Sequence, residues 1–367
     1  MKTVCKINKC NGCMACVECC PKNCITIIDK IDTFNAVIDK FTCIECKLCE
    51  KICPNNIIPK QREPIKWKQG WTTTEIRNNS TSGGIAATIT KNFIQSGGYV
   101  ASCLFKNGQF IFELTNDLKV AKRFAGSKYV KSNPIGIYEK IKERLKTDTV
   151  LFIGLPCQVA ALKNYLKDHE NLYTIDLICH GTPSVKLLEK YLFEINYNLE
   201  EVKDIQFRIK TDMGLHLNRK KITLPRVMDE YTCTFLESIN YTENCYSCQF
   251  ARLERVADIT LGDSWGTEYL LQEKNGVSLI LIQTEKGKKL INIPEIELKN
   301  VDLENAIKNN HQLSQPSVLT DKRKKFLKMI NDGKSFKYAT LLVLPKTFIK
   351  QKIKLILIKL KLIKNDN

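Results

Sequence analysis

The sequence predicts two folded domains, a small α+β domain built around cysteines and a larger α/β domain after it. Two observations predict this division. Cysteines crowd into the first part of the chain with a spacing that occurs twice, and strand–turn–helix patterns follow one another in its middle. A length of 367 residues, with 43% apolar and 26% charged residues, is ordinary for a globular protein with a sizeable core.

The sequence contains seventeen cysteines and has a net charge of +18. Both features indicate the compartment and the kind of partner that we expect for the protein. The opening residues MKTVCKINKC have no apolar stretch typical of a signal peptide, and the cysteine number is odd. We therefore expect a cytoplasmic protein whose thiolates act as ligands, and no spanning helix, because no long uncharged apolar run occurs. The charge favours an anionic partner, such as a phosphate-bearing cofactor, an acidic protein or a membrane surface. No nucleic-acid module is recognisable, so no nucleic acid is expected.

The cysteine pattern C-x2-C-x2-C-x3-C-P occurs twice near the start of the chain. Its first copy comprises Cys10, Cys13, Cys16, Cys20 and Pro21, and its second comprises Cys43, Cys46, Cys49, Cys53 and Pro54. In bacterial two-cluster ferredoxins with this pattern, three thiolates of one copy and the fourth of the other hold each 4Fe-4S cube. We therefore expect clusters on two quartets: Cys10, Cys13, Cys16 and Cys53, and Cys43, Cys46, Cys49 and Cys20. Two complete quartets with proline disfavour the alternative, a pair of zinc knuckles.

Residues 1–60 are thus expected to form a ferredoxin domain. Between the two copies, residues 25–41 (ITIIDKIDTFNAVIDKF) alternate in the manner of a small hairpin that covers the clusters. Residues 61–78 are rich in proline and charge and lack apolar periodicity, which predicts a linker. Three cysteines outside the repeated spacing are expected to pack as ordinary thiols: Cys5, Cys19 and Cys24.

Two loops of the second domain, expected at residues 79–335, are candidates for binding phosphate. In STSGGIAATITKNFI, residues 80–94, a glycine pair runs into a helical pattern, which leaves backbone donors free at a helix N-terminus. A simple helix cap explains this segment as well. In AGSKYVKSNP, residues 125–134, hydroxyls, lysines and a tyrosine could contact the phosphates and ring of a cofactor. An exposed basic loop has the same composition.

Two strand–turn–helix units, TVLFIGLPCQVAALKNYL and NLYTIDLICHGTPSVKLLEKYL, predict α/β architecture for residues 149–192. Cys157 and Cys179 each come at the carboxyl end of a predicted strand, the edge where open α/β sheets place their sites. Together with the CxxC pair of Cys245 and Cys248 they make four thiolates, enough for a third 4Fe-4S cluster or a zinc site. The alternatives are buried core thiols, or a reactive thiol at Cys157.

Taken in order, these motifs resemble the coenzyme F420 hydrogenase/dehydrogenase beta-subunit family, which includes related plant chlorophyll-cycle reductases. The resemblance covers nearly the whole chain. Beside the ferredoxin quartets, it rests on the SGG loop at Ser82–Gly84, AGSKY at 125–129, GLPCQ at 154–158, ICHG at 178–181, CxxC at 245–248 and ADITLGDSWG at 257–266.

The resemblance implies that the second domain is an α/β flavin and iron–sulfur domain. It implies FAD, and a third 4Fe-4S cluster held by Cys157, Cys179, Cys245 and Cys248. It also implies that the family's flavin contacts fall on Ser82, Gly83, Gly84, Gly126, Ser127, Lys128 and Tyr129. Family members exchange hydride between flavin and a second molecule, often coenzyme F420, and many bacterial members occur beside genes for surface polysaccharide synthesis. The sequence does not identify that second molecule, and no catalytic residue is assigned.

The expected function is that of an iron–sulfur flavoprotein oxidoreductase, which couples one-electron transfer through 4Fe-4S clusters to hydride transfer at FAD. Its expected partners are a redox protein and a small-molecule hydride acceptor or donor such as coenzyme F420. One alternative is an electron-transfer subunit that feeds a separate enzyme, for example in surface polysaccharide synthesis. Another is a zinc-stabilised binding module.

The end of the chain, residues 336–367, is expected to form a basic apolar tail. Its lysines and aliphatic residues alternate without a clean amphipathic pattern. One interpretation is a helix at an anionic membrane surface, which would make the protein peripheral at the inner membrane face. The other is a terminal helix docked on the domain or on a partner subunit.

Overall fold

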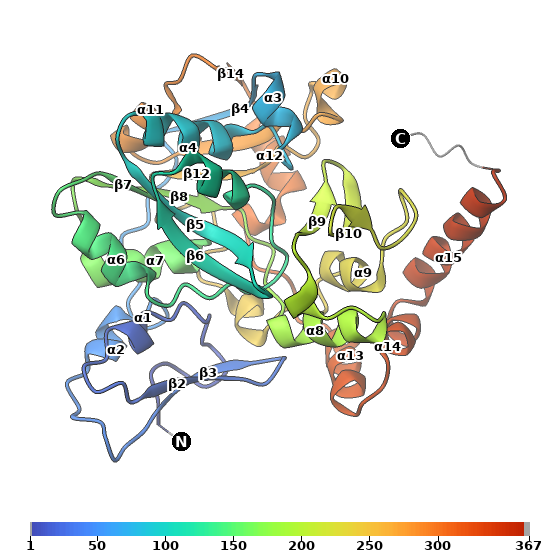
Figure 1. Ribbon diagram of the computed structural model, residues 1–367, viewed down its shortest axis with the longest axis horizontal. Coiled ribbons are helices and arrows are strands. Elements are labelled where there is room, and N and C mark those ends of the chain that lie inside the picture. The colour runs from blue at the N-terminus through green and yellow to red at the C-terminus, as the bar shows by residue number, and fades with distance from the viewer. Residues whose placement is uncertain (1, 363–367) are drawn as a thin grey trace.

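The computed structural model describes residues 2–362 and shows a ferredoxin domain beside a large α/β domain (Figure 1). The last residues of the expected tail, 363–367, lie outside the described residues. The ferredoxin domain contains a three-stranded sheet and two short helices: β1 (Lys2–Thr3), β2 (Ile25–Asp29), β3 (Phe34–Ile38), α1 (Ala15–Glu18) and α2 (Leu48–Ile52). β2 and β3 pair antiparallel, which confirms the predicted hairpin.

The two copies of the cysteine pattern fold in the same way. In each copy a residue in the left-handed region, Met14 (φ 62°) or Lys47 (φ 59°), precedes a short helix. The second residue of that helix is the third cysteine of the copy, Cys16 or Cys49. The hairpin residue Phe34 packs in one core with cysteines of both copies. The internal repeat of the sequence is therefore a structural repeat.

An eight-stranded mixed sheet forms the centre of the large domain, in the order β14-β4-β13-β12-β8-β7-β5-β6. The parallel strands lie side by side: β12 (Ile259–Asp263), β8 (Leu172–Leu177), β7 (Val150–Gly154) and β5 (Tyr99–Lys106). The remaining strands pair antiparallel: β6 (Gln109–Thr115), β13 (Ser278–Ile282), β4 (Lys66–Thr72) and β14 (Ile296–Lys299). The predicted units correspond to β7 with α7 (Pro156–Leu166) and β8 with α8 (Val185–Glu194), which confirms the α/β prediction.

Helices cover both faces of this sheet. α4 (Ile85–Gln95) and α11 (Glu285–Ile291) pack with aliphatic strand residues on one face. α6 (Ile137–Arg144) and α7 cover the other face, and α1 and α2 of the ferredoxin domain contact these two helices (Figure 1). Cys13 lies in the same buried cluster as Tyr138 of α6. The ferredoxin domain and the α/β domain thus share part of a core.

A second core, which the sequence did not predict, lies beside the sheet around Phe207, Tyr231 and Phe336. Together with α8 it is built from β9 (Ile205–Ile209), β10 (Asp212–Leu217), β11 (Lys220–Lys221), α9 (Glu230–Leu236), α13 (Asp321–Asn331) and α14 (Phe336–Val343). Short helices connect the larger elements: α3 (Thr74–Asn78), α5 (Leu118–Ala121), α10 (Leu270–Glu273) and α12 (Leu303–Asn309). Short 3-10 helices also connect larger elements: η1 (Lys122–Phe124), η2 (Leu199–Glu201), η3 (Glu243–Ser247) and η4 (His311–Leu313).

The predicted linker at residues 61–78 is wrong for most of its length. Residues 66–72 form β4, which lies inside the sheet between β13 and β14, and α3 follows directly. The first half of β4 is exposed or half-buried and carries Lys66 and Lys68, whereas only its last four residues are buried. The lysines therefore concealed the strand pattern in the sequence.

The tail begins in the second core and then leaves it. α14 packs within that core, whereas α15 (Pro345–Lys359) extends away from the sheet (Figure 1). Gln351 Oε1 accepts a hydrogen bond from Met228 N at 3.0 Å, and Lys352 pairs with Glu230 at 3.3 Å, so α15 also contacts the domain. Within residues 2–362, no helix is long and apolar enough to cross a membrane. Exposed aliphatic side chains remain on α15 and just after it: Ile349, Ile353, Ile356, Leu360 and Leu362.

Candidate functional site

The first predicted quartet comes together in the ferredoxin core. Burial raises the pKa of Cys13 well above its usual value, and the nearby Cys16, Cys53 and Cys10 add to this shift. All four side chains are buried. The fourth cysteine of the second copy therefore joins three of the first copy, as the ferredoxin pattern predicts.

The second predicted quartet also comes together, nearer the surface. Burial raises the pKa of Cys49, with smaller contributions in the same direction from Cys20 and Cys46. Cys24 lies close to two members of this quartet. Its sulfur atom is 3.4 Å from that of Cys20, and its thiol also contacts Cys43. Cys46 is exposed, whereas the other three cysteines of this quartet are half-buried.

Cys5 and Cys24 are buried against the two ferredoxin quartets. The Cys5 thiol donates hydrogen bonds toward Cys10 and Cys53, which raises the pKa of Cys5, and Cys24 lies against Cys20 and Cys43. Each of these thiols thus touches two members of one quartet, one from each copy of the repeat. Hydrogen bonds to cluster sulfurs tune reduction potential, so a tuning role for these two thiols is a prediction beside the expected packing role. The sequence carried no signal for this role, because neither residue falls in the repeated spacing.

The third quartet forms at the carboxyl edge of the sheet. β7 and β8 are parallel neighbours, so Cys157 at the start of α7 and Cys179 after β8 emerge side by side. Burial raises the pKa of Cys157 well above its usual value, and Cys248, Cys179 and Cys245 raise it further. Burial and the same CxxC pair raise the pKa of Cys179 to about 12. The four cysteines are therefore close neighbours.

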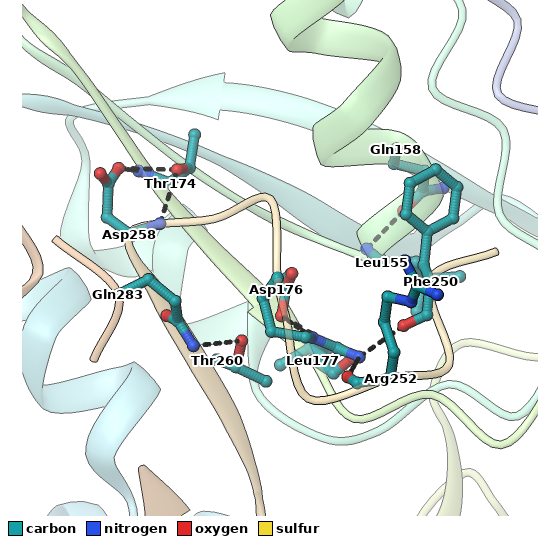
Figure 2. A network of polar contacts seen from close by, with 11 residues as sticks. Leu155, Gln158, Thr174, Asp176, Leu177, Phe250, Arg252, Asp258, Thr260 and Gln283 are labelled. Carbon is teal, nitrogen blue, oxygen red and sulfur yellow. Dashed lines mark hydrogen bonds and ion pairs between the residues drawn. The ribbon is translucent and has the colours of Figure 1, made fainter. Parts of the chain in front are cut away.

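A buried ion pair between Arg255 and Asp176 ties the segments of the third quartet together. Figure 2 labels Asp176 with Leu177 and Phe250, whose carbonyl oxygens also accept from this arginine. Arg255 Nη2 lies 3.2 Å from Asp176 Oδ1, and both side chains are almost completely buried. The same guanidinium donates to the carbonyl oxygens of Leu177 at 2.9 Å and Phe250 at 2.7 Å. It therefore connects the end of β8, which leads to Cys179, with the segment that follows the CxxC pair.

The donor sets suit iron–sulfur clusters. Four thiolates crowded together repel one another, so they ionise together only around a cationic centre. Among residues 2–362, no three His, Cys, Asp or Glu side chains converge closely enough to hold a single metal ion. A 4Fe-4S cube binds its thiolates at four separate irons, so its ligands need not converge on one point. Ligation by the twelve cysteines remains a prediction.

The glycines of the predicted SGG flavin loop are used by packing within the protein. A Cβ on Gly83 would lie 2.4 Å from the Gly70 carbonyl oxygen, and one on Gly84 would lie 2.5 Å from Thr72 Cγ2. The Ser82 hydroxyl donates to the Val277 carbonyl at 3.1 Å. This loop packs against β4 and the start of β13, and its flavin contacts remain a prediction.

The predicted AGSKY loop lies next to the SGG loop, with the hydroxyls of Thr81 and Ser127 3.5 Å apart. Gly126 has φ 90° and faces open space, since no atom lies within 4 Å of its built Cβ. Lys128 donates to carbonyl oxygens of its own loop, and burial lowers the pKa of Lys128. The Tyr129 ring is stacked on Phe235, with centroids 4.2 Å apart. Gly126 and Ser127 are therefore better placed for a ligand than Lys128 and Tyr129.

A polar hollow beside these loops contains charged residues that the sequence did not reveal. Arg208 of β9 bonds both carboxylate oxygens of Asp263, at 2.9 and 2.7 Å, where β12 ends. Burial, together with the cations Arg77 and Arg208, lowers the pKa of Lys210 to about 8. The hollow also includes Thr81 and Trp265, and its volume is about 20 Å³. Only the fold of β9 brings these cations to the sheet edge, so no local motif could have shown them.

His180 lies between the third quartet and this hollow. It follows Cys179 directly, and Asp263 and Arg208 both influence its ring. Burial lowers the pKa of His180 to about 4, and His311 acts in the same direction, so the ring is neutral at pH 7. Gln312 Nε2 lies 2.8 Å from His180 Nδ1. A neutral, held imidazole can orient a bound group without adding charge.

Two family models match the chain, one in each domain. Residues 147–304 match the model for the C-terminal part of the coenzyme F420 hydrogenase/dehydrogenase beta subunit, and residues 9–63 match a 4Fe-4S dicluster domain. Residues 147–304 therefore resemble the C-terminal part of this beta subunit, and a 4Fe-4S dicluster domain precedes them. Together the matches support an iron–sulfur electron-transfer oxidoreductase related to this beta subunit.

Two relatives come from Methanocaldococcus jannaschii. An uncharacterized protein is 26% identical over 77% of this chain and 85% of its own length. A coenzyme F420-dependent sulfite reductase is 24% identical over 80% of this chain. That match spans 47% of the sulfite reductase, so this chain corresponds to about half of it.

A solved structure shares the fold. A chain of the F420-reducing [NiFe] hydrogenase complex from Methanosarcina barkeri aligns with a TM-score of 0.50 and 19% identity. The alignment covers 76% of this chain and 98% of that chain.

Proposed function

We propose that this oxidoreductase carries single electrons along three 4Fe-4S clusters to a bound FAD, which exchanges hydride with a small molecule. The observation that carries the proposal is the gathering of twelve cysteines into three quartets, each close to the next. Flavin accepts electrons singly and releases them as a pair, which is the chemistry that a cluster chain needs to serve a hydride acceptor.

Contacts between the quartets support one order of transfer. Cys16 of the first quartet is close enough to Cys49 of the second that each charge acts on the other. Tyr138 lies between the first and third quartets, because both Cys13 and Cys157 act on its hydroxyl. The first quartet therefore lies between the second and the third. His180 then leads from the third quartet to the Arg208–Asp263 hollow.

The surroundings of each quartet suit its place in this order. Cys46 leaves the second quartet open to solvent, where another protein can approach. Phe41, which is fully exposed, and Ile44 lie in the same segment. The first quartet is buried, which shields its proposed cluster from water and oxygen. We propose that a redox partner protein docks over the second quartet.

The proposed FAD contacts are the residues predicted in the two loops, to which the structure adds Lys210 and Arg208. Both cations suit a pyrophosphate, and Gly126 leaves room for one. Cofactor sites have volumes of about 300–1,000 Å³, far above that of the hollow, so binding a flavin requires residues that line the hollow to move apart. For this reason no catalytic step is assigned to a residue.

The hydride acceptor proposed first is coenzyme F420, which the family description names. An electron-transfer subunit that feeds a separate enzyme is the second candidate. The exposed second quartet favours it, since the same surface can deliver electrons as well as accept them. The exposed aliphatic side of α15, with its lysines, also suits peripheral contact with an anionic membrane.

Anaerobic reduction assays test this proposal. The purified protein is reduced with dithionite and freed of excess reductant. It is then mixed with coenzyme F420, and the absorbance of the coenzyme is followed in a spectrophotometer. The first candidate predicts multiple turnovers when reductant is resupplied, and Cys157→Ser should abolish them because the third cluster is lost. Full turnover in Cys157→Ser would contradict transfer through the third quartet. No reaction in the wild type, despite bound FAD, would favour the electron-transfer subunit.

A further inference from the structure

A single buried lysine lies between the first and third quartets. Lys131 is 6% exposed, and its Nζ donates to the Asn11 carbonyl oxygen at 3.1 Å. Asn11 follows Cys10 directly in the first quartet's loop. The Lys131 backbone N–H donates to the Pro183 carbonyl at 2.9 Å, in the segment that follows Cys179. Lys131 thus contacts the loops that carry ligands of two different proposed clusters.

Its ammonium acts on thiols of both quartets. The ammonium is close enough to Cys157 and Cys179 of the third quartet that its charge acts on both thiols. The same charge acts on Cys10 of the first quartet. At Cys49 of the second quartet, the neighbouring charges that act are those of Glu50, Cys20 and Cys46 instead.

The charge of Lys131 lacks a carboxylate counterion. Among residues 2–362, it forms no ion pair with an aspartate or glutamate, and its other contact is the Phe34 ring, 4.9 Å from Nζ to the centroid. Burying an ammonium without a paired anion is strongly unfavourable. Thiolate-ligated iron–sulfur clusters are anionic, and two of them on either side would supply the missing negative charge.

We propose that Lys131 raises the reduction potentials of the first and third clusters together and leaves the second cluster unaffected. A positive charge stabilises the more negative, reduced form of a cluster, so electrons are drawn inward from the exposed second cluster. Because one cation raises the first and third potentials in the same direction, it attracts electrons to both clusters without favouring one strongly over the other. The inference rests on the proposed function, because it requires clusters on these quartets.

The test is an anaerobic potentiometric titration of the full chain, followed by electron paramagnetic resonance. Lys131→Gln removes the charge but keeps a donor for the Asn11 carbonyl. We expect two cluster potentials to fall by at least about 59 mV, a tenfold shift in each one-electron equilibrium. The second cluster, identified by the altered signal of Cys46→Ser, should keep its potential. Lys131→Arg, which keeps the charge, should retain most of the wild-type values.

Lys9→Met is the matched control. Lys9 also bridges the two domains, since its Nζ donates to Ser247 Oγ at 2.7 Å beside Cys248, but it does so at the surface. Water screens its charge, so its removal should leave all three potentials unchanged.

Three results would overturn the proposal. One is a Lys131→Gln protein with its full iron content and unchanged potentials, and another is an equal fall in all three potentials. The third is loss of iron from Lys131→Arg as well as from Lys131→Gln, which would show a packing role. Loss of the first and third clusters from Lys131→Gln alone would support the proposal. A wild-type protein without three clusters would instead refute the proposed function.

Discussion

Replacing Arg255 by methionine removes one charge from a fully buried ion pair. Arg255 and Asp176 are 2% and 0% exposed, and they lie 3.2 Å apart. Methionine is apolar, so Asp176 would be left as an unpaired buried carboxylate, and the carbonyl oxygens of Leu177, Phe250 and Arg252 would lose their side-chain donor. Removing one partner of a buried pair costs about 3–5 kcal/mol, and we expect the free energy of unfolding to fall by about that amount.

The assay is anaerobic denaturant unfolding followed by circular dichroism, with Arg252→Met as the matched control. Arg252 pairs with Glu254 at 3.9 Å while both side chains are about half exposed, so its loss should cost less than about 1 kcal/mol. Arg255→Met should also reduce the iron content by about four atoms, one cube, because Cys179 and Cys248 lose their common support. Equal stability losses in the two variants would refute the reasoning.

The remaining predictions concern the cofactor hollow, a glycine and the tail. Because the pKa of Lys210 is lowered to about 8, wild-type affinity for FAD should fall as pH rises through 8, whereas Lys210→Arg should keep its affinity; fluorescence titration measures both. Gly84→Ala should destabilise by about 1–3 kcal/mol more than Gly136→Ala in thermal unfolding, since both glycines have positive φ but only Gly84 lacks space for a Cβ. Deleting residues 345–367 should abolish co-sedimentation with anionic vesicles, and an unchanged bound fraction would contradict contact through α15.

Local spacing carried most of what the sequence could predict. The ligand pattern of a cube requires cysteines at short, fixed intervals, so the sequence alone predicted both ferredoxin quartets. β7 and β8 were visible because parallel strands covered on both faces are almost continuously apolar. Cys157 and Cys179 followed from the rule that sites lie at the carboxyl edge of such a sheet.

The rest depended on contacts between distant segments. β4 was missed because Lys66 and Lys68 hide its pattern. Arg208 and Lys210 reach the sheet edge only through the fold of β9 and β10. In the sequence, Lys131 is one of several basic residues of a predicted loop. Its burial between two quartets follows from how the ferredoxin domain packs on α6 and α7. Each of these features is tertiary, so no window of sequence contained it.

The measurement that tests the central claim most directly is a count of iron, acid-labile sulfide, zinc and flavin per chain after purification without oxygen. Three cubes and one flavin predict about twelve irons, about twelve sulfides, one FAD and no zinc. About eight irons with zinc and no flavin would contradict the account, because the third quartet would then be a zinc site and the chain a ferredoxin joined to a binding domain.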